Sequence, residues 1–481
     1  MADLENTLRD QWEKTLKKEL KLDNISSKTS RKQIEGGSWP TLSLSHDHEL
    51  SLPVREEWKK SSQTYVLLGE NFLSEIKEDL KDGVRVFFFH HEHMNEDKWK
   101  AIKQVFSEFS HPSEIESFIL GSSVLSGAEV HHDGGDNIQE LALMARKVFL
   151  THQKEVITGV YLDSQFFKNI AKVRAAKLLA LKIFEETQAS KRLTVLGLTS
   201  YREWTLFERY SNMLRNEAAV ASGFIAGADF VQSSGYQNLF ELETQEIDSI
   251  HRERSQRMAR NTSHILSLES MLGVVEDAAY GSFHLENLTQ HYASSAWELL
   301  KKILPMGEEE CLSYLKTQTT PVRESRLNQV KTRRTVLAGM NDFPDAKEKL
   351  GLKKTPEALS FRVSRDFENL RLLVEKLKSP PKIRIAIMGD YAALNARVNF
   401  VKNYFELLGL EVKESLDLKD IKEDIFVLCA SDEDYPQLTL PEIKADKFIA
   451  GKFEMPGFQN LFAGQSVYEV LEKVVSKWSQ K

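Results

Sequence analysis

The sequence is poor in cysteine and lacks the marks of several specialised protein classes. Its two cysteines, Cys311 and Cys429, lie far apart, which excludes a disulfide framework and a CxxC metal site and favours the reducing cytoplasm. It contains no apolar run of about 18 residues, the length of a membrane span, and its charged N-terminus has no apolar export segment. A net charge of -7 gives no electrostatic reason to expect nucleic acid or an anionic membrane as a partner.

Histidine is missing from the whole C-terminal part of the chain. The last of the thirteen histidines is His291, so residues 381–481 contain none. Imidazole is the commonest side-chain ligand for metals in proteins. A metal or metallocofactor bound in this region would therefore need other ligands.

From residue 76 to residue 305, short apolar runs alternate with longer helical segments. Runs such as "GVRVFFFH", "EVITGVYL" and "RLTVLGL" are followed by segments such as "NIQELALMARKVFLTH". The alternation repeats about six to eight times, which is typical of a parallel (β/α)8 TIM barrel. The sequence thus predicts an α/β fold with a barrel at residues 76–305.

The remaining sequence divides into three parts. Residues 1–75 hold a predicted helix, Leu4–Leu20, and then a polar arm, "DNISSKTSRKQIEGGSWPTLSLSHDHE", which we expect to contact another subunit. Residues 306–380 are charged and helical, and they end at the proline pair of "SPP". Residues 381–481 place the apolar runs "IRIAIMG", "DIFVLCAS" and "KFIAG" between helices, a pattern that predicts a small doubly wound α/β domain.

Several blocks of the sequence resemble one enzyme family. The most specific is "RMARNTSHILSLESMLGVVEDAAYGSFHLENLTQHYASSAWELL" (Arg257–Leu300), and the others are His131–Leu150, Phe166–Glu185 and Thr199–Asp229. They resemble the barrel of methylmalonyl-CoA mutase, an adenosylcobalamin-dependent isomerase. In addition, "RRTVLAGMNDFPD" and "SRDFENLR" are similar to segments of the small, non-catalytic subunit of this family.

This resemblance implies a TIM barrel threaded by an acyl-CoA and followed by a flavodoxin-like cobalamin-binding domain. In the active family, the cofactor generates the radical that interconverts methylmalonyl-CoA and succinyl-CoA. The protein holds, orients and shields the reacting groups. The residues that bind the cofactor and the substrate in the family can therefore be sought in this sequence.

The cobalt-binding turn of the family is degenerate in this chain. Active members carry D-x-H-x-x-G after the first strand of the cobalamin domain, and its histidine is the lower cobalt ligand. Here that strand is followed by "MGDYAALNARV", so the ligand position falls on Ala392 or Ala393. Only Gly451 remains of the family's glycine pair, although Ser431 is similar to its pocket serine. We therefore expect no cofactor and no metal in this chain, with adenosylcobalamin bound by a partner subunit.

The predicted barrel keeps some family residues and has lost others. Aligned from "YSNMLR", which ends at Arg215, the family's H-C-Q-T-S-G segment falls on "LGLTSY". Thr199 and Ser200 match this segment, and with Arg215 they are the substrate-binding residues that the resemblance implies. The substrate-contacting histidine is replaced by Leu196, and the second barrel histidine falls in Ser233–Gly235, which has none. No catalytic residue is expected.

Other polar groups have both a functional and a structural interpretation. They are "HHEH" (His90–His93) as a metal cluster, His131, His132 and Asp133 at a strand end, and Arg257, Arg260 and Asn261 as a cradle for CoA phosphates. Polar residues at a strand end and surface histidines are the favoured interpretations of the first two groups. A structural role at the barrel rim is at least as well supported for the third. Glu269, Asp277 and Glu286 form no acid pair of known spacing.

Three functional hypotheses remain open. The favoured one is a non-catalytic small subunit in a heterodimer with a large catalytic mutase chain. The second is a divergent acyl-CoA mutase that binds cobalamin without a protein histidine ligand. The third is a barrel enzyme of another class that only shares ancestry with the mutases.

Overall fold

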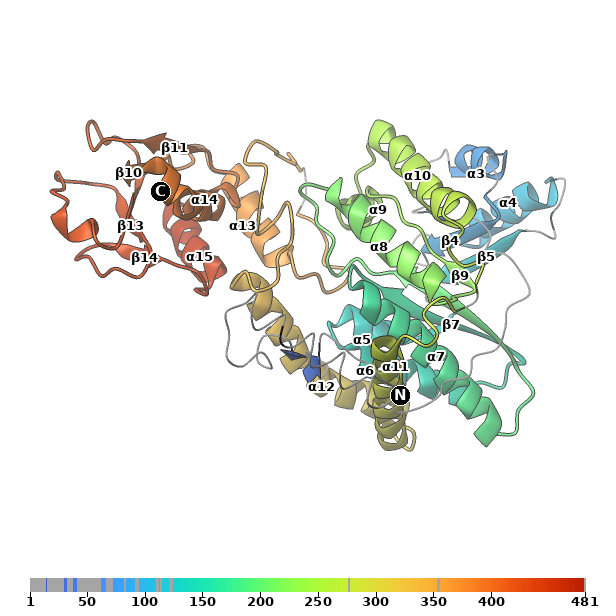
Figure 1. The fold of residues 1–481 in the computed structure, drawn as a ribbon. Coiled ribbons are helices and arrows are strands. Elements are labelled where there is room, and N and C mark those ends of the chain that lie inside the picture. The colour runs from blue at the N-terminus through green and yellow to red at the C-terminus, as the bar shows by residue number, and fades with distance from the viewer. Residues whose placement is uncertain are drawn as a thin grey trace. The chain divides into compact units, whose positions relative to one another are not determined.

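The computed structural model describes residue 14 and residues 30–32, 38–40, 62–65, 72–81, 84–90, 95–109, 112, 115–120, 124–275, 277–352 and 355–479. Apart from Lys14, the predicted helix Leu4–Leu20 lies outside the described residues, as do most of the predicted arm and His91–His93 of "HHEH". The chain divides into two compact units (Figure 1). Unit 1 comprises residues 1–202, 213–323 and 359–361, and unit 2 comprises residues 203–212, 324–358 and 362–481.

Unit 1 contains a three-stranded parallel sheet. Its strands are β3 (Ser62–Tyr65), β4 (Val86–His90) and β5 (Glu116–Leu120), with the helices α3 (Phe72–Lys81) and α4 (Glu96–Ser107) between them in sequence. Side chains alternate across β4, so that Phe87 and Phe89 pack among apolar residues of α3 and α4 while Phe88 faces the other way. A short antiparallel pair, β1 (Ser30–Lys32) and β2 (Ser38–Pro40), precedes this sheet in sequence.

A second parallel sheet in unit 1 carries the predicted site. Its strands are β6 (Leu125–Ser126), β7 (Glu155–Leu162), β8 (Arg192–Thr199) and β9 (Phe230–Val231), in that order. The helices between them in sequence are α5 (Ala128–His132), α6 (Asn137–Leu150), α7 (Phe166–Glu186) and α8 (Ser211–Ile225). The register sets Leu196 of β8 beside Gly159 of β7 and Phe230 of β9. Because the strands are parallel, their carboxyl ends share one edge, where such folds hold ligands.

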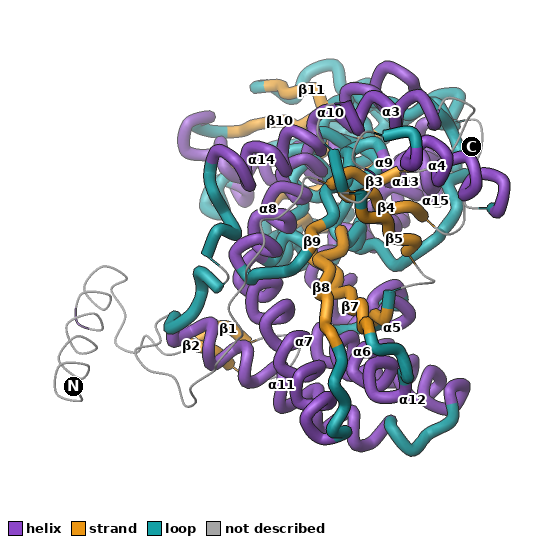
Figure 2. The backbone as a smooth tube through the Cα atoms, turned by 90° about the vertical axis from the view of Figure 1, so that its right-hand side faces the viewer, coloured by secondary structure: helices purple, strands orange, loops and turns teal. Residues whose placement is uncertain are grey.

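The four-stranded sheet separates two apolar cores. On one face, α6 and α7 pack against the strands, and α11 (Phe283–Ile303) packs against both helices (Figure 2). On the other face lies an inter-sheet cluster, which is formed by Val86, Phe88, Phe118, Tyr161, Leu196 and Leu198. This cluster joins strands of the three-stranded sheet to strands of the four-stranded sheet. The rings of Phe118 and Phe230, one from each sheet, have centroids 5.5 Å apart.

The rest of unit 1 is helical. It contains α9 (Asn238–Thr244), α10 (Ser249–His264) and a π-helical turn (Ile265–Glu269), while α12 (Glu308–Lys331) spans the sequence boundary between the units. One close approach fixes the connection between β6 and α5. A Cβ atom on Gly127 would lie 2.2 Å from the carbonyl oxygen of Glu140 in α6, so only glycine fits there.

Unit 2 is built on a five-stranded parallel sheet. Its strands are β10 (Ile383–Met388), β11 (Val412–Ser415), β12 (Ile425–Ala430), β13 (Asp446–Ala450) and β14 (Gln459–Leu461), in the order β11-β10-β12-β13-β14. This is the 2-1-3-4-5 order of flavodoxin-like folds, which bind ligands where the order reverses. The helices are α13 (Arg365–Glu375), α14 (Tyr391–Glu406) and α15 (Val467–Trp478), with a 3-10 turn at Tyr435–Gln437.

The predicted α/β class with parallel sheets is confirmed. The described parallel strands of unit 1 form sheets of three and four strands, and the closed eight-stranded barrel stays a prediction. The cobalamin-binding character of residues 381–481 and the predicted domain boundaries also stay predictions. None of the described helices is both long enough and apolar enough to cross a bilayer.

A buried carboxyl group in α9 is expected to make the stability of unit 1 depend on pH. Burial raises the pKa of Glu241 to about 8 and outweighs the lowering effect of Arg252, whose guanidinium lies 3.3 Å away and also pairs with Glu75 at 3.1 Å. A carboxyl group with a raised pKa stabilises the fold at low pH, and this contribution is lost as the pH rises through the folded pKa.

The variant Glu241→Gln should therefore gain stability relative to the wild type as the pH increases from 4.5 to 8. Urea unfolding of both proteins across this range measures the difference. A difference that stays constant with pH would contradict the raised pKa.

Candidate functional site

Thr199 and Ser200 lie where β8 ends, within a layer of buried polar side chains. The backbone N–H of Thr199 donates to Oε1 of Gln232 at 2.8 Å, and its hydroxyl accepts from the hydroxyl of Ser234 at 3.0 Å. The backbone N–H of Ser200 donates to the carbonyl of Leu162, the last residue of β7, at 2.9 Å. The two residues thus lie together at the carboxyl edge of the sheet, and their polar groups bond to the protein itself.

His131 contacts Ser200, a pairing that the sequence alone did not indicate. Its Nε2 is 2.9 Å from the hydroxyl oxygen of Ser200, and its Nδ1 is 3.0 Å from a carboxylate oxygen of Glu140 in α6. The favoured interpretation as surface histidines is wrong for His131, which is 3% exposed, and correct for His132, which is exposed. The ring of His131 is enclosed by Glu140 and Tyr161, whereas His132 stays exposed although its Nε2 lies 3.2 Å from the hydroxyl of Tyr161.

Glu140 is the centre of this polar layer. The oxygen that contacts His131 also accepts from Nζ of Lys172 at 3.0 Å, and the other oxygen accepts from the backbone N–H of Tyr161 at 2.8 Å. The side chains of Glu140 and Lys172 are 0% and 2% exposed, so each charge is compensated within the protein and not by water. The rings of His131 and Tyr161 stack with centroids 4.2 Å apart.

Glu140, His131 and Ser200 have the geometry of a carboxylate–histidine–serine relay. In the neutral tautomer that carries its proton on Nδ1, His131 would donate to Glu140 and its Nε2 would accept the hydroxyl proton of Ser200, which is how a serine nucleophile is activated. Nη2 of Arg202 also lies 3.1 Å from Nδ1, which adds a cation to this contact. Such a nucleophile needs room for a reacting carbonyl about 3 Å from its oxygen. All three residues are at most 3% exposed. We therefore interpret the relay as a buried structural network.

The segment where the family has its second barrel histidine is also filled by internal contacts. The hydroxyl of Ser233 donates to the carbonyl of Ala259 at 2.8 Å and accepts from Nδ2 of Asn216 at 3.1 Å. A Cβ atom on Gly235 would lie 2.3 Å from Oγ of Ser255. An imidazole at position 235 would therefore displace α10.

Leu196, the predicted position of the family's substrate-contacting histidine, is fully buried in the inter-sheet cluster. Its companions there include Phe88, Phe118 and Tyr161. A histidine in this cluster would bring ring nitrogens into apolar surroundings, and an unpaired buried polar group costs about 1–3 kcal/mol. The interior thus suits leucine and disfavours the family's histidine.

The basic candidates are spread over two helices. Arg215 lies near the start of α8 and is 9% exposed. Arg257, Arg260 and Asn261 lie in the second half of α10, which begins at Ser249. Arg260 forms an ion pair with Asp79 of α3, whereas Arg257 and Asn261 are exposed. The structural interpretation therefore holds for Arg260.

Two of the acidic candidates meet at Arg174, which the sequence did not single out. Arg174 is fully buried in α7, where its Nε donates to Asp277 at 2.9 Å and its Nη2 donates to Glu286 at 2.7 Å. Burial raises the pKa of Asp277 above its ordinary value, against the lowering effect of the arginine charge. Glu269 is exposed. The sequence did offer one signal for this cluster, an arginine within the apolar stripe of a helix. A buried cation needs acidic partners.

In unit 2, the turn after β10 forms the start of α14. Gly389 has a φ of +131°, and Oδ1 of Asp390 accepts from the backbone N–H of Ala392 at 3.1 Å, which caps the helix. Ala392 and Ala393, the predicted positions of the cobalt ligand, are exposed in the first turn of α14. The aspartate therefore caps a helix, and the ligand positions carry only methyl groups.

The guanidinium of Arg397 covers the strand ends next to this turn. From α14, its Nη1 donates to the carboxylate of Asp432 at 2.8 Å and reaches the carbonyl oxygens of Ala430 and Ala450, which end β12 and β13. The hydroxyl of Tyr435 donates to the same carbonyl of Ala450 at 2.6 Å. Two large side chains thus occupy the edge where flavodoxin-like folds bind ligands.

The two remaining matches to the family's cofactor pocket are held in local turns. The hydroxyl of Ser431 donates to the carboxylate of Asp434 at 2.6 Å. Gly451 has a φ of +114°, and its N–H donates to the carbonyl of Leu461 at 2.8 Å. Neither residue needs a bound molecule to satisfy these groups.

Metal and thiol chemistry have little support in the part of the chain that the structure describes. No three histidine, cysteine, aspartate or glutamate side chains there are grouped so that they could hold a metal ion. Burial raises the pKa of Cys429 to about 11 and also raises the pKa of Cys311. A thiol with a raised pKa is a poor nucleophile at neutral pH.

Comparison with known proteins supports the similarity to the methylmalonyl-CoA mutases that the sequence blocks suggested. The family profile of methylmalonyl-CoA mutase matches residues 159–378, from within β7 to the segment before β10. The predicted resemblance to the methylmalonyl-CoA mutase family is therefore confirmed.

Within this class, the chain is similar to the methylmalonyl-CoA mutase small subunits. It is 28% identical to that of Porphyromonas gingivalis over 325 residues, which are 61% of this chain and 51% of the relative. It is also 28% identical to that of Streptomyces virginiae over 394 residues, 74% of this chain and 61% of the relative. A more distant relative is the 2-hydroxyisobutanoyl-CoA mutase large subunit of Aquincola tertiaricarbonis, 26% identical over 38% of this chain and 34% of the relative. The chain thus spans about half the length of the curated relatives it matches.

Proposed function

We propose that this chain is the small, non-catalytic subunit of a heterodimeric, adenosylcobalamin-dependent methylmalonyl-CoA mutase. Its partner is a large catalytic subunit that binds the cofactor and interconverts methylmalonyl-CoA and succinyl-CoA. In this proposal, unit 1 corresponds to the family's barrel and unit 2 to a degenerate cobalamin-binding-type domain. The observation that carries the proposal is the complete burial of Leu196 in the inter-sheet cluster.

The packing of the inter-sheet cluster supports the proposal that unit 1 does not turn over a substrate. In the active family, an acyl-CoA runs through the barrel axis and meets a histidine at the position of Leu196. Here the rings of Phe88, Phe118 and Tyr161 pack around this leucine. An acyl chain would have to displace packed apolar side chains, and it would meet no imidazole at this position.

The strand ends of unit 2 do not fit a cobalamin held by a protein histidine. Ala392 and Ala393 offer no ligand atom, and residues 381–481 contain no histidine at all. Arg397 also fills the edge of the sheet with a cation bonded to Asp432 and to two strand ends. The proposal therefore assigns cofactor chemistry to the partner and association to this chain.

Exposed apolar side chains offer a surface for that partner. Nine of the twenty large apolar residues that are exposed in the described part of the chain come from one segment, between Ile247 and Tyr280. They include Leu268 and Val275, which are 63% and 62% exposed. Concentrated exposed apolar residues are typical of protein interfaces. We assign this segment, together with the predicted N-terminal arm, to contact with the large subunit.

Co-expression with the large mutase chain of the same organism tests the proposal. A tagged copy of this chain should retain the large subunit through purification. The double variant Leu268→Asp with Val275→Asp should weaken the complex by at least about tenfold, because two charges would be buried at the interface. Leu416→Asp changes a residue that is 69% exposed in unit 2 and serves as the matched control.

Titration of the isolated chain with adenosylcobalamin separates the proposal from its main alternative. The non-catalytic subunit should leave the visible spectrum of the cofactor unchanged. Tight binding with a change in the cobalt spectrum would contradict the proposal.

The alternative is a divergent acyl-CoA mutase that binds cobalamin without a protein histidine. The similarity to a 2-hydroxyisobutanoyl-CoA mutase large subunit favours this candidate. It requires turnover of an acyl-CoA by this chain with adenosylcobalamin and without a partner. An assay of the isolated chain with methylmalonyl-CoA and with 2-hydroxyisobutanoyl-CoA measures that activity directly.

A further inference from the structure

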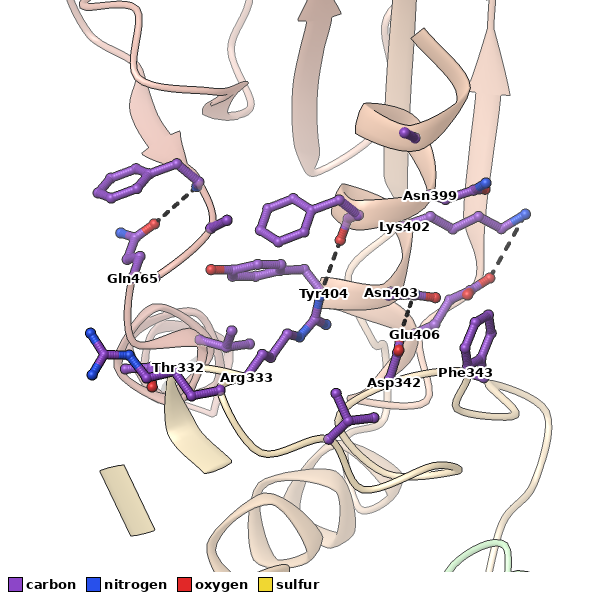
Figure 3. Close-up of a pocket in the computed structure, with 18 residues that line it drawn as sticks. Thr332, Arg333, Asp342, Phe343, Asn399, Lys402, Asn403, Tyr404, Glu406 and Gln465 are labelled. Carbon is purple, nitrogen blue, oxygen red and sulfur yellow. Dashed lines mark hydrogen bonds and ion pairs between the residues drawn. The ribbon is translucent and has the colours of Figure 1, made fainter. Parts of the chain in front are cut away.

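Unit 2 contains a cavity that the proposed function does not use. It has a volume of about 810 Å³ and lies between the segment after α12, one face of α14 and the connection from β14 to α15 (Figure 3). This volume falls within the range of about 300–1,000 Å³ that is typical of small-molecule pockets. Its lining combines aromatic rings with charged groups, namely Phe343, Phe400, Tyr404 and Phe462 with Arg333, Arg334, Lys402, Asp342 and Glu406.

Arg333 has an unusual backbone for its residue type. It follows the last residues of α12 in the left-handed conformation, with a φ of +57°, and its N–H donates to the carbonyl of Val330 at 3.1 Å. Helices most often place glycine at this position, because glycine has no Cβ to clash. Phe343, which lines the same cavity, is also left-handed, with a φ of +51°. The chain thus keeps two large side chains at this cavity on backbone that glycine would suit better.

The guanidinium of Arg333 has unused hydrogen-bonding capacity. It lies 4.8 Å from the ring centroid of Tyr404 and 5.5 Å from that of Phe400. Its Nη1 reaches the carbonyl of Phe400 at 3.5 Å, whereas Nε and Nη2 are buried and have no hydrogen-bond partner among the residues that the structure describes. Nε and Nη2 form the two-donor edge of arginine that binds both oxygens of a carboxylate or a phosphate.

Three of the other charged groups of the cavity, Lys402, Glu406 and Asp342, are already engaged. Lys402 pairs with Glu414 at 3.0 Å and with Glu406 at 4.0 Å, and a carboxylate oxygen of Asp342 accepts from Asn403 at 3.0 Å. Figure 3 shows the Lys402–Glu406 and Asn403–Asp342 contacts on one side and Arg333 reaching toward Tyr404 on the other. Burial lowers the pKa of Arg333, against the opposing effects of Tyr404 and Asp342. The guanidinium is therefore incompletely compensated by its surroundings.

We propose that this cavity binds a small organic anion, whose carboxylate or phosphate pairs with Nε and Nη2 of Arg333 and whose flat apolar body lies against the aromatic lining. On binding, the arginine side chain turns from the rings of Phe400 and Tyr404 toward the anion. Binding is favoured because it pairs two buried donors that otherwise have no hydrogen-bond partner. This site goes beyond the mutase proposal, because it depends only on residues of unit 2 and on no partner subunit.

Calorimetric titration of the full chain with benzoate, AMP and inorganic phosphate tests the site. Benzoate or AMP should bind, and inorganic phosphate should bind at least about tenfold more weakly because it has no apolar body. Tighter binding of AMP assigns the site to phosphates, and tighter binding of benzoate assigns it to carboxylates. Absence of binding by both compounds, or equal binding of inorganic phosphate, would overturn the proposal.

The variant Arg333→Gly separates binding from folding. Glycine suits the left-handed backbone, so the fold should persist while the affinity for benzoate or AMP falls at least about tenfold. Arg333→Lys keeps the charge but removes the two-donor edge, and an intermediate loss is expected. Arg334→Ala removes the exposed neighbouring cation and should change the affinity much less. Unchanged affinity in Arg333→Gly, with amide exchange showing the segment after α12 intact, would overturn the assignment to Arg333.

Discussion

Replacement of Glu140 by glutamine is expected to lower the free energy of unfolding by about 3–5 kcal/mol, the usual loss when one partner of a buried ion pair is removed. The variant leaves Lys172 charged at 2% exposure and 3.0 Å from a neutral amide. It also replaces the carboxylate that accepts from His131 and from the backbone N–H of Tyr161. Four elements would therefore loosen together, because Glu140 links α5, α6, α7 and the end of β7.

Urea unfolding measures this loss, and hydrogen–deuterium exchange locates it. Exchange should rise in peptides of α5, α6 and β7 in unit 1 and stay unchanged in the sheet of unit 2. Glu241→Gln is the matched control, since it changes another buried glutamate of unit 1 whose pKa of about 8 already favours the neutral form at pH 7. A loss below about 1 kcal/mol in Glu140→Gln would show that the carboxylate is not the centre of this network.

Replacement of Glu368 by glutamine should destabilise unit 2 by a similar amount, about 3–5 kcal/mol. Glu368 and Arg362 are each 1% exposed, and Nη2 of Arg362 donates to the carboxylate at 2.6 Å. The same carboxylate accepts from the backbone N–H of Leu206, and Arg362 donates to the carbonyl of Trp204 at 3.1 Å. The pair thus holds residues 203–212 within unit 2, and exchange in this segment should increase in the variant.

The effect of Glu368→Gln should also depend on pH. Burial by itself would raise the pKa of Glu368, but the charge and hydrogen bonds of Arg362 outweigh it and hold the pKa below its ordinary value of 4.5. A carboxylate with a lowered pKa stabilises the fold above its unfolded pKa, and this contribution is lost as the pH falls through the folded value. The difference between wild type and variant should therefore be constant at neutral pH and shrink in acid.

Asp366→Asn provides the control on the same helix. Asp366 pairs with Lys331 at 2.8 Å, but its side chain is 34% exposed, and exposed pairs contribute about 0–1 kcal/mol. If both variants lost the same stability, burial of the Arg362–Glu368 pair would not be the cause. Stability curves from pH 3 to pH 8 for both variants make the comparison.

The local pattern of the sequence was sufficient to predict the parallel strands and the residues at their ends. Alternation in "VFFFH" and the apolar runs that became β7, β8, β10 and β12 follow directly from side-chain periodicity. The adjacency of Thr199 and Ser200 at a carboxyl end follows from the strand boundary. The start of α14 at Tyr391, with Asp390 as its cap, follows from the Gly-Asp turn.

Partners that come from distant segments could not be predicted in this way. His131 meets Ser200 across 69 positions, and Arg174 meets Asp277 across 103 positions. Nothing in a single sequence states which buried acid compensates which buried cation, because the choice is made by packing. The same reason explains why His131 was assigned to the surface, and why the reach of Arg397 across two strand ends was not foreseen.

The position of Arg397 also limits how this protein could change over evolutionary time. A histidine substituted at Ala392 would leave the guanidinium of Arg397 on the ends of β12 and β13. Removal of Arg397 alone would sacrifice its bond to Asp432 without providing a ligand. A histidine-ligated cofactor at this strand edge would therefore require both substitutions together.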